Sequence, residues 1–173
     1  MSSSTELISL LLNFLNYFFV FLLIFNLLKV NYFNPIVSVC VKIYKPISKI
    51  FFLIPNQVIN IFLIAIAIKF LSLIISYGNQ YETLNLLGVA VIQTLMVILR
   101  MIFFAVIGGV ILSWVSPGPN PFIELVEEIS SKTLAPIRKF VPSAGGLDFS
   151  PLFVLILINL IESFLTEIVR TIV

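Results

Sequence analysis

The stretch APIRKFVPSAGGLDFSP, residues 135–151, interrupts a sequence that is otherwise dominated by long apolar runs. Pro136 and Pro142 have no amide hydrogen to donate, so both end helices. The pair Gly145-Gly146 permits a tight bend, because glycine tolerates positive φ. The stretch therefore predicts a reverse turn at a membrane surface, from which the chain enters a last apolar span.

The second part of the same stretch carries the residues that start the next helix. We expect Asp148 or Ser150 to cap the following span, with Pro151 near its first turn, where a missing amide hydrogen costs little. The adjacent cations Arg138 and Lys139 are not needed to make a turn. We expect them to attract anionic lipid headgroups at the membrane surface. Docking of a protein partner, or binding to Asp148, are the alternatives.

The composition is that of an integral membrane protein. Of 173 residues, 60% are hydrophobic and 10% are charged, with a mean hydropathy of +1.18, whereas a soluble domain is about half apolar and a quarter charged. The net charge of +2 is too small to indicate a nucleic-acid partner. There is no histidine and one cysteine, Cys40, which we expect to be a small buried hydrophobe. We therefore expect no enzyme activity, no metal and no cofactor.

Four segments have the roughly 20 consecutive apolar residues that a membrane-spanning helix needs. They cover residues about 7–28, 57–77, 84–114 and 149–172. The start of the chain, MSSSTE, contains no lysine or arginine. A cleavable signal peptide has a basic first region, so we do not expect one here.

The two long connections between spans both begin with Asn-Pro, at Asn34-Pro35 and Asn120-Pro121. Asparagine is a good N-cap, and proline is tolerated in the first helical turn, so each pair predicts the start of a helix. The charged residues of each segment fall on one helical face. We expect amphipathic helices lying in the membrane interface at about 34–49 and 120–131.

These elements suggest an internal repeat. The Asn-Pro pairs lie 86 residues apart, as Pro35 and Pro121 show, and the order of span, interfacial helix, bend and span is the same in both halves. The expected repeats are residues 1–77 and 84–173, with the Pro/Gly turn at 136–151 in the second. Each repeat has an even number of spans, which makes the repeats parallel rather than inverted. The predicted fold is an all-α membrane protein of four transmembrane helices.

The position of the cations predicts the orientation. The two long connections hold Lys29, Lys42, Lys45, Lys49, Lys132, Arg138 and Lys139, and the opposite side holds only Arg170. Cytoplasmic loops are rich in Lys and Arg. We therefore expect a bacterial inner-membrane protein with both connections in the cytoplasm and both termini outside. We also expect Lys42 and Lys45 of the first interfacial helix to meet Glu124 and Glu128 of the second.

Three charged residues fall deep inside the predicted spans: Lys69, Arg100 and Glu162. Charges in the hydrocarbon core are costly and normally pair or line a cavity. We expect Glu162 to neutralise Lys69 or Arg100, with Gln93 and Asn159 as neighbours. The cluster either fixes how the spans pack or lines a path for ions or solutes.

A stripe of small residues, Ala105, Gly109 and Ser113, follows one face of the third span. Small residues allow helices to approach closely in membranes. The stripe predicts a helix contact, either within the fold or between two copies of the chain.

The second half resembles the YggT family of small bacterial membrane proteins, which has relatives in chloroplasts. The resemblance rests on WVSPGPNPF and LAPIRKFVPSAGGLDFSP. The matching positions are Trp114, Asn120-Pro121, Pro136, Arg138-Lys139, Pro142, Gly145-Gly146, Asp148 and Ser150-Pro151. The first half matches only at Asn34-Pro35, Pro46 and Pro55, and it lacks the Gly-Gly-x-Asp segment. Lys132 stands where many relatives have a proline.

The resemblance implies a non-catalytic scaffold or accessory protein, which supports assembly of membrane complexes or tolerance of osmotic and salt stress. The expected partners are the anionic lipids of the bilayer and a membrane protein or a second copy of the chain. The alternative is a small dimeric ion or solute transporter or channel, with Lys69, Arg100 and Glu162 on its path.

Overall fold

The computed structural model describes residues 3–50, 54–115, 118, 120–141 and 148–172. These residues form six α-helices and one short 3-10 helix, and no strand is found among them. The helices are α1 Ser3–Leu27, α2 Pro35–Ile50, α3 Gln57–Tyr77, α4 Thr83–Val115, α5 Pro121–Leu134, η1 Ile137–Lys139 and α6 Ser150–Ile172.

Four of the helices, α1, α3, α4 and α6, are long and apolar enough to cross a membrane. All four predicted spans are therefore helical in the structure, and they indicate a multi-pass membrane protein. The longest is α4, whose 33 residues extend about 50 Å. A bilayer core is about 30 Å thick, so α4 is long enough to project beyond it.

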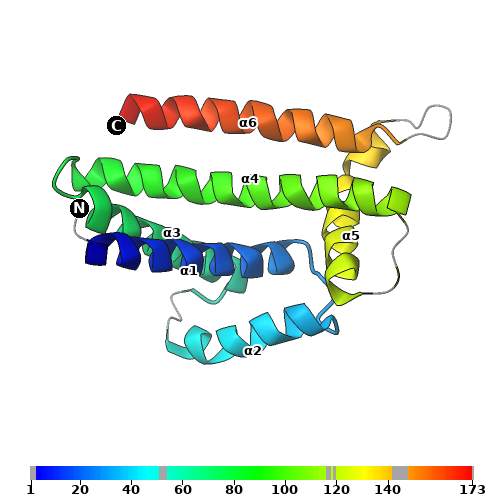
Figure 1. Cartoon of the computed structure of the whole chain (residues 1–173), viewed down its shortest axis with the longest axis horizontal. Helices are drawn as coiled ribbons and strands as arrows, with labels where there is room; N and C mark the ends of the chain where they lie inside the picture. Colours follow the sequence, from blue (N-terminus) through cyan, green and yellow to red (C-terminus); the bar gives the residue numbers. More distant parts are fainter. Residues whose placement is uncertain (1–2, 51–53, 116–117, 119, 142–147, 173) are drawn as a thin grey trace.

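The four long helices lie side by side, with both chain termini at the same end (Figure 1). α1 and α3 pack closely together, α3 also packs on α4, and α6 lies on the outside against α4. One buried polar contact joins the first pair, because Asn16 Nδ2 of α1 donates to the carbonyl oxygen of Ala65 at 2.8 Å. Hydrogen bonds of this kind are common between membrane helices, where they stabilise close packing.

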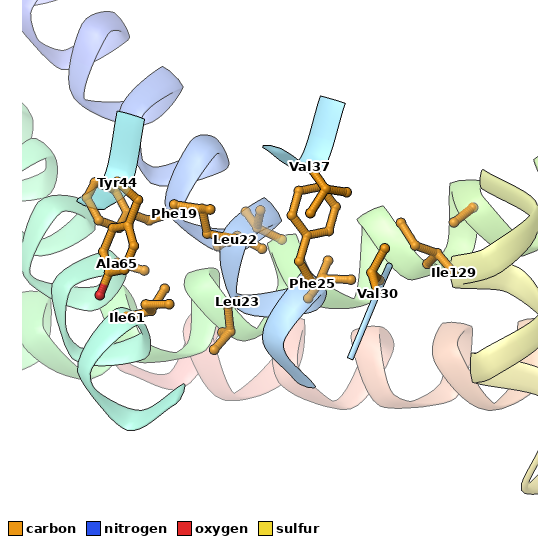
Figure 2. Packing of buried hydrophobic residues seen from close by; sticks show 14 of the residues in the cluster. Phe19, Leu22, Leu23, Phe25, Val30, Val37, Tyr44, Ile61, Ala65 and Ile129 are labelled. Atoms are coloured by element: carbon orange, nitrogen blue, oxygen red, sulfur yellow. The ribbon is translucent and has the colours of Figure 1, made fainter. Parts of the chain in front are cut away.

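The main hydrophobic core is centred on the second half of α1 (Figure 2). Phe19, Leu22 and Phe25 are buried there, and Ile61 and Ala65 approach from α3. α2 and α5 also contribute to this core, through Val37, Tyr44, Leu125 and Ile129. The connection helices are thus part of the packed fold.

The predicted helix starts at the two Asn-Pro pairs are confirmed. α2 begins at Pro35 and α5 at Pro121. The side chain of Asn34 accepts a hydrogen bond from the amide of Ile36 at 3.0 Å, and that of Asn120 accepts one from Phe122 at 2.9 Å. Each asparagine thereby satisfies one of the amides that a helix start leaves free.

The two connection helices differ in orientation. α5 crosses the end of the bundle, whereas α2 runs back along α1 (Figure 1). The matching sequence patterns predicted the same placement for both. The division into two repeats stays a prediction.

The small-residue stripe of α4 makes a contact within the fold. Ala105 is buried in the core, and Gly109 lies under α5. A Cβ atom on Gly109 would meet the side chain of Ser130, and one on Gly108 would lie 2.9 Å from Val126 Cγ1. The absence of side chains at these two glycines is what lets α5 lie directly on α4.

Candidate functional site

A polar joint links the connection between α1 and α2 to α5. Asn34 Nδ2 donates to the carbonyl oxygen of Pro121 at 2.7 Å, which brings the two Asn-Pro pairs together. The amide of Asn31 donates to both carboxylate oxygens of Glu128, at 2.9 and 3.1 Å. Lys132 pairs with Glu128 at 2.7 Å and also donates to the carbonyl oxygen of Lys29. α5 therefore holds the turn after α1 in place.

The predicted pairing of Lys42 and Lys45 with Glu124 and Glu128 is wrong. Within the described part of the chain, neither lysine forms a salt bridge, and both are exposed. Glu128 instead binds its own helix neighbour Lys132 and the backbone of the α1–α2 connection. The exposed Lys42 and Lys45 of α2 therefore do not pair with the acidic residues of α5 in the structure.

An ion pair joins the two ends of the Pro/Gly turn. Arg138 Nε lies 2.8 Å from Asp148 Oδ2, and the other carboxylate oxygen accepts the amide of Ser150 at 2.9 Å. Partial burial raises the pKa of Asp148, but the hydrogen bonds from Arg138 and Ser150 and the charge of Arg138 outweigh it and hold the pKa below its ordinary value. Of the two predicted capping residues, Asp148 therefore caps the start of α6.

The other residues of the predicted motif take simpler positions. Pro136 precedes η1, and Pro151 lies in the first turn of α6. Lys139 is exposed, and it forms no salt bridge with any described residue. Pro142, Gly145 and Gly146 lie outside the described residues.

Arg138 and Asp148 also line a groove of about 670 Å³ between α4, α5 and α6. We call it the corner groove. Its lining includes Gly109 and the exposed Trp114 of α4, Leu134 of α5, and Leu152 and Leu155 of α6. The groove thus combines a largely apolar lining with one charged pair, which suits a segment that is partly in the bilayer and partly in water.

The charges inside the spans divide into two separate contacts. Arg100 Nε of α4 lies 3.1 Å from Glu162 Oε1 of α6. Lys69 of α3 is bound instead to Asn13 of α1, whose Oδ1 accepts from the ammonium at 2.8 Å. Glu162 therefore neutralises Arg100, one of the two predicted possibilities. Lys69 forms no salt bridge among the described residues.

A second hollow, of about 320 Å³, lies between all four long helices. Lys69, Gln93 and Arg100 line it, together with Tyr17 of α1 and Thr166 of α6. Gln93 is therefore a neighbour of the charged residues, as predicted. Asn159 is not part of this hollow, but it lines another one together with Glu162, and its side-chain amide donates to the carbonyl oxygen of Leu155 in its own helix.

A polar stripe of α1 that faces α3 was not predicted from the sequence. Ser9, Asn13 and Asn16 lie four and three residues apart and all bind α3 or its side chains. Ser9 Oγ lies 3.1 Å from Ser72 Oγ and accepts from Ser76 Oγ at 2.9 Å. The signal was present, because polar residues at helical spacing inside an apolar span indicate a helix contact.

These features define a class: a multi-pass helical membrane protein whose connection helices pack into the bundle and whose last turn is held by an ion pair. A family model described as CCB3/YggT matches residues 88–169. An uncharacterized protein of Haemophilus influenzae is 31% identical over 144 residues, which cover 81% of this chain and 78% of that protein. The chain belongs to the CCB3/YggT family.

Two further relatives match shorter regions. An uncharacterized protein of Pseudomonas aeruginosa is 42% identical over 87 residues, 50% of this chain and 44% of that protein. Uncharacterized protein YggT of Escherichia coli K12 is 28% identical over 112 residues, 62% of this chain and 57% of that protein. The alignments thus span about half the length of these two relatives. No solved structure matches the chain.

The region matched by the family model runs through α4, α5, η1 and most of α6. It includes both the Arg138–Asp148 pair and the Arg100–Glu162 pair. Lys69 and its partner Asn13 lie outside it. The corner groove is therefore built from the part of the chain that the family model describes.

Proposed function

We propose that this protein is a non-catalytic scaffold or accessory factor of the bacterial inner membrane. It docks a membrane-protein partner at the corner groove and thereby supports the assembly of a membrane complex or tolerance of osmotic and salt stress. The observation that carries the proposal is the Arg138–Asp148 pair, 2.8 Å apart, in the lining of a largely apolar groove that also includes the exposed Trp114. Exposed aromatic and arginine side chains are enriched where proteins bind one another.

The proposal places the corner groove at the cytoplasmic face, with both termini outside. The support is the excess of lysine and arginine in the two connections. In this orientation the exposed Lys139 faces anionic lipid headgroups, whose attraction contributes about 1 kcal/mol per cation. Lipid contact and partner docking then use neighbouring parts of one surface.

The test is affinity purification from gently solubilised membranes at matched expression. Lys139→Glu changes an exposed cation without breaking the Arg138–Asp148 pair. Lys45→Glu on α2 makes the same charge change away from the groove and is the matched control. We expect a selective partner to be recovered with the native protein and Lys45→Glu and lost with Lys139→Glu and Arg138→Glu.

Exchange of the paired charges separates docking from folding. Arg138→Asp combined with Asp148→Arg restores an ion pair but reverses its direction. If partner binding requires a positive charge at position 138, the exchanged protein should fold, because its ion pair is restored, but it should still lose the partner. Loss of the partner with the Lys45→Glu control, or no selective partner for the native protein, would contradict the scaffold proposal.

The second candidate is a small ion or solute transporter or channel. It is favoured by the hollow of about 320 Å³ between the four long helices, with Lys69 and Arg100 in its wall. Charged residues facing a cavity inside a membrane often mark a transport path. Ion flux through protein reconstituted in vesicles, abolished by Glu162→Gln, would support it. Equal background flux for both proteins would exclude it.

A further inference from the structure

α6 has an exposed flank that is unusually polar for a membrane-spanning helix. A hollow of about 360 Å³ runs along it. We call this surface the polar flank, and it consists of Asn159, Glu162, Ser163, Thr166, Glu167 and Arg170. The neighbouring exposed face of α6 is apolar and aromatic, as Phe153, Leu160 and Phe164 show. The apolar face is suited to lipid chains, and the polar flank is not.

The contacts within one chain do not cover the polar flank. α6 packs mainly on α4 and lies at the outside of the bundle (Figure 1). Among the described residues, Asn159, Ser163 and Thr166 hydrogen-bond only back to carbonyl oxygens one turn earlier in α6. Arg100, beside the flank on α4, donates through Nε alone within the described residues, although its side chain is 58% exposed.

Such a surface needs a cover in a bilayer. Polar side chains inside the hydrocarbon region face the interior of a bundle, a partner helix or water, because lipid chains offer no hydrogen bonds. Glu162 lies near the middle of α6, so neither end of the span brings it to a headgroup. Its flank must therefore meet either protein or a water-filled space.

We propose that a second copy of this chain covers the polar flank, in a parallel dimer with a two-fold axis along the membrane normal. The charges of the surface balance, since Arg100 and Arg170 are matched by Glu162 and Glu167. Each arginine lies at the depth of the carboxylate it binds. A two-fold axis then gives a ring of alternating charge, in which each arginine can reach both its own glutamate and that of the other copy.

The neutral residues of the flank fit the same arrangement. A two-fold axis parallel to α6 brings each residue to the same depth as its own copy. Asn159 and Ser163 can each donate and accept a hydrogen bond, so each can pair with itself. The flank is thus complementary to itself in charge and in hydrogen bonding. The dimer goes beyond the scaffold proposal, because the corner groove lies elsewhere on the molecule. The affinity purification that tests the scaffold proposal does not depend on the polar flank.

Cysteine cross-linking in native membranes tests the dimer. Replacing the single cysteine by Cys40→Ser gives a background without thiols. Ser163→Cys introduces a small, isosteric thiol on the polar flank. Phe164→Cys is the matched control, because it is the next residue, is also exposed, and lies toward the apolar face. We expect oxidation or a short thiol cross-linker to join two chains at position 163 and not at position 164.

Three results would overturn the proposal. The first is no cross-link at position 163 in folded protein, or equal cross-linking at 163 and 164. The second is a cross-link from position 163 to a different protein. The third is modification of the Ser163→Cys variant by a membrane-impermeant thiol reagent without cross-linking, which would indicate a water-filled space. Fluorescence resonance energy transfer between labelled chains, measured as the protein is diluted in lipid vesicles, gives a second readout of association. In this measurement Ser163→Leu should weaken dimerisation about fivefold.

Discussion

α2 and α5 follow the same Asn-Pro signal, yet α5 lies directly on the preceding span and α2 only partly so. The two pairs are 86 residues apart, and the same offset relates Gly108 and Gly109 of α4 to Leu22 and Leu23 of α1. Ser130, which rests on Gly109, corresponds to Tyr44, which packs its ring edge-on against Phe19. Side-chain volume on the preceding span thus decides how closely the connection helix approaches.

The polar faces of the two helices differ in the same way. Glu128 and Lys132 of α5 hold the backbone of the α1–α2 connection. The corresponding residues of α2 are Lys42, which is exposed, and Pro46, which has no amide hydrogen and lies inside the helix. α5 therefore joins the two halves through polar contacts. α2 contributes one apolar face to the main hydrophobic core.

The largest effect is expected from filling the glycine contact. Gly109→Leu places a side chain where even a Cβ atom would overlap Ser130, so α5 must move off α4. Overpacking of this kind costs about 3 kcal/mol. We expect a clear fall in the melting temperature of the detergent-solubilised protein and a loss of the compact α4–α5 arrangement, measured by thermal unfolding and by limited proteolysis.

Two variants control this prediction. Gly118→Leu adds the same side chain at a position where no described atom lies within 4 Å of an added Cβ, and it should leave stability unchanged. Gly109→Ala combined with Ser130→Gly removes the colliding side chain and should recover most of the stability that Gly109→Ala alone loses. Equal stability of Gly109→Leu and the native protein would show that the close approach of α5 is not required.

Much of the fold follows from local sequence. The packing of α5 on Gly109 of α4 is a part that local sequence did not predict. Apolar runs of sufficient length and two Asn-Pro pairs are local signals, and they predicted four spans and two helix starts. The stripe containing Gly109 predicted a close helix contact but not its partner. The partner is α5, which reaches α4 through a turn, and the path of a turn depends on contacts far apart in sequence.

The second prediction compares the two asparagine caps. Among the described residues, the side chain of Asn120 only caps α5, whereas that of Asn34 caps α2 and also donates to the carbonyl oxygen of Pro121. Asn120→Ala should therefore cost about 1 kcal/mol, and Asn34→Ala about 2 kcal/mol because a partly buried hydrogen bond between the halves is lost as well. Thermal unfolding of the two variants under identical conditions measures the difference. Equal losses would mean that the bond to Pro121 adds no stability.

The third prediction concerns the acid that joins α5 to the α1–α2 connection. Glu128→Gln keeps the shape of the side chain but removes the charge that binds Lys132 and strengthens the bond from the amide of Asn31. We expect a loss of about 1 kcal/mol, together with faster amide exchange around Asn31. Lys42→Gln removes a charge at the corresponding position of α2 and should have no measurable effect. A comparable loss for Lys42→Gln would contradict the difference between the halves.

The candidate site was only partly predictable, for reasons that particular residues make clear. Asp148 is near Arg138 in sequence, so their pairing was among the options that the turn allowed. Lys69 had no such constraint, because depth in the membrane alone could not distinguish Glu162 from other partners. The structure gives it Asn13, a neutral residue on a helix far away in sequence. Helix rotation decides such partners, and rotation is set by packing.

The smallest expected effect is a difference in the pH dependence of stability between the caps of α3 and α6. Asn56 caps α3 with a neutral side chain, and Asp148 caps α6 with a carboxylate whose pKa lies below the ordinary value of 3.8. Because the folded-state pKa of Asp148 is lowered, its contribution to stability is present above pH 3.8 and is lost as the pH falls through the folded-state pKa. The pair is partly exposed, which limits this contribution to less than about 1 kcal/mol. Thermal unfolding between about pH 7 and about pH 3 should show a steeper decline for the native protein than for Asp148→Asn. Asn56→Asp should add a similar decline of stability at low pH through the cap of α3. Identical pH profiles for the native protein and Asp148→Asn would mean that the ion pair does not stabilise the turn.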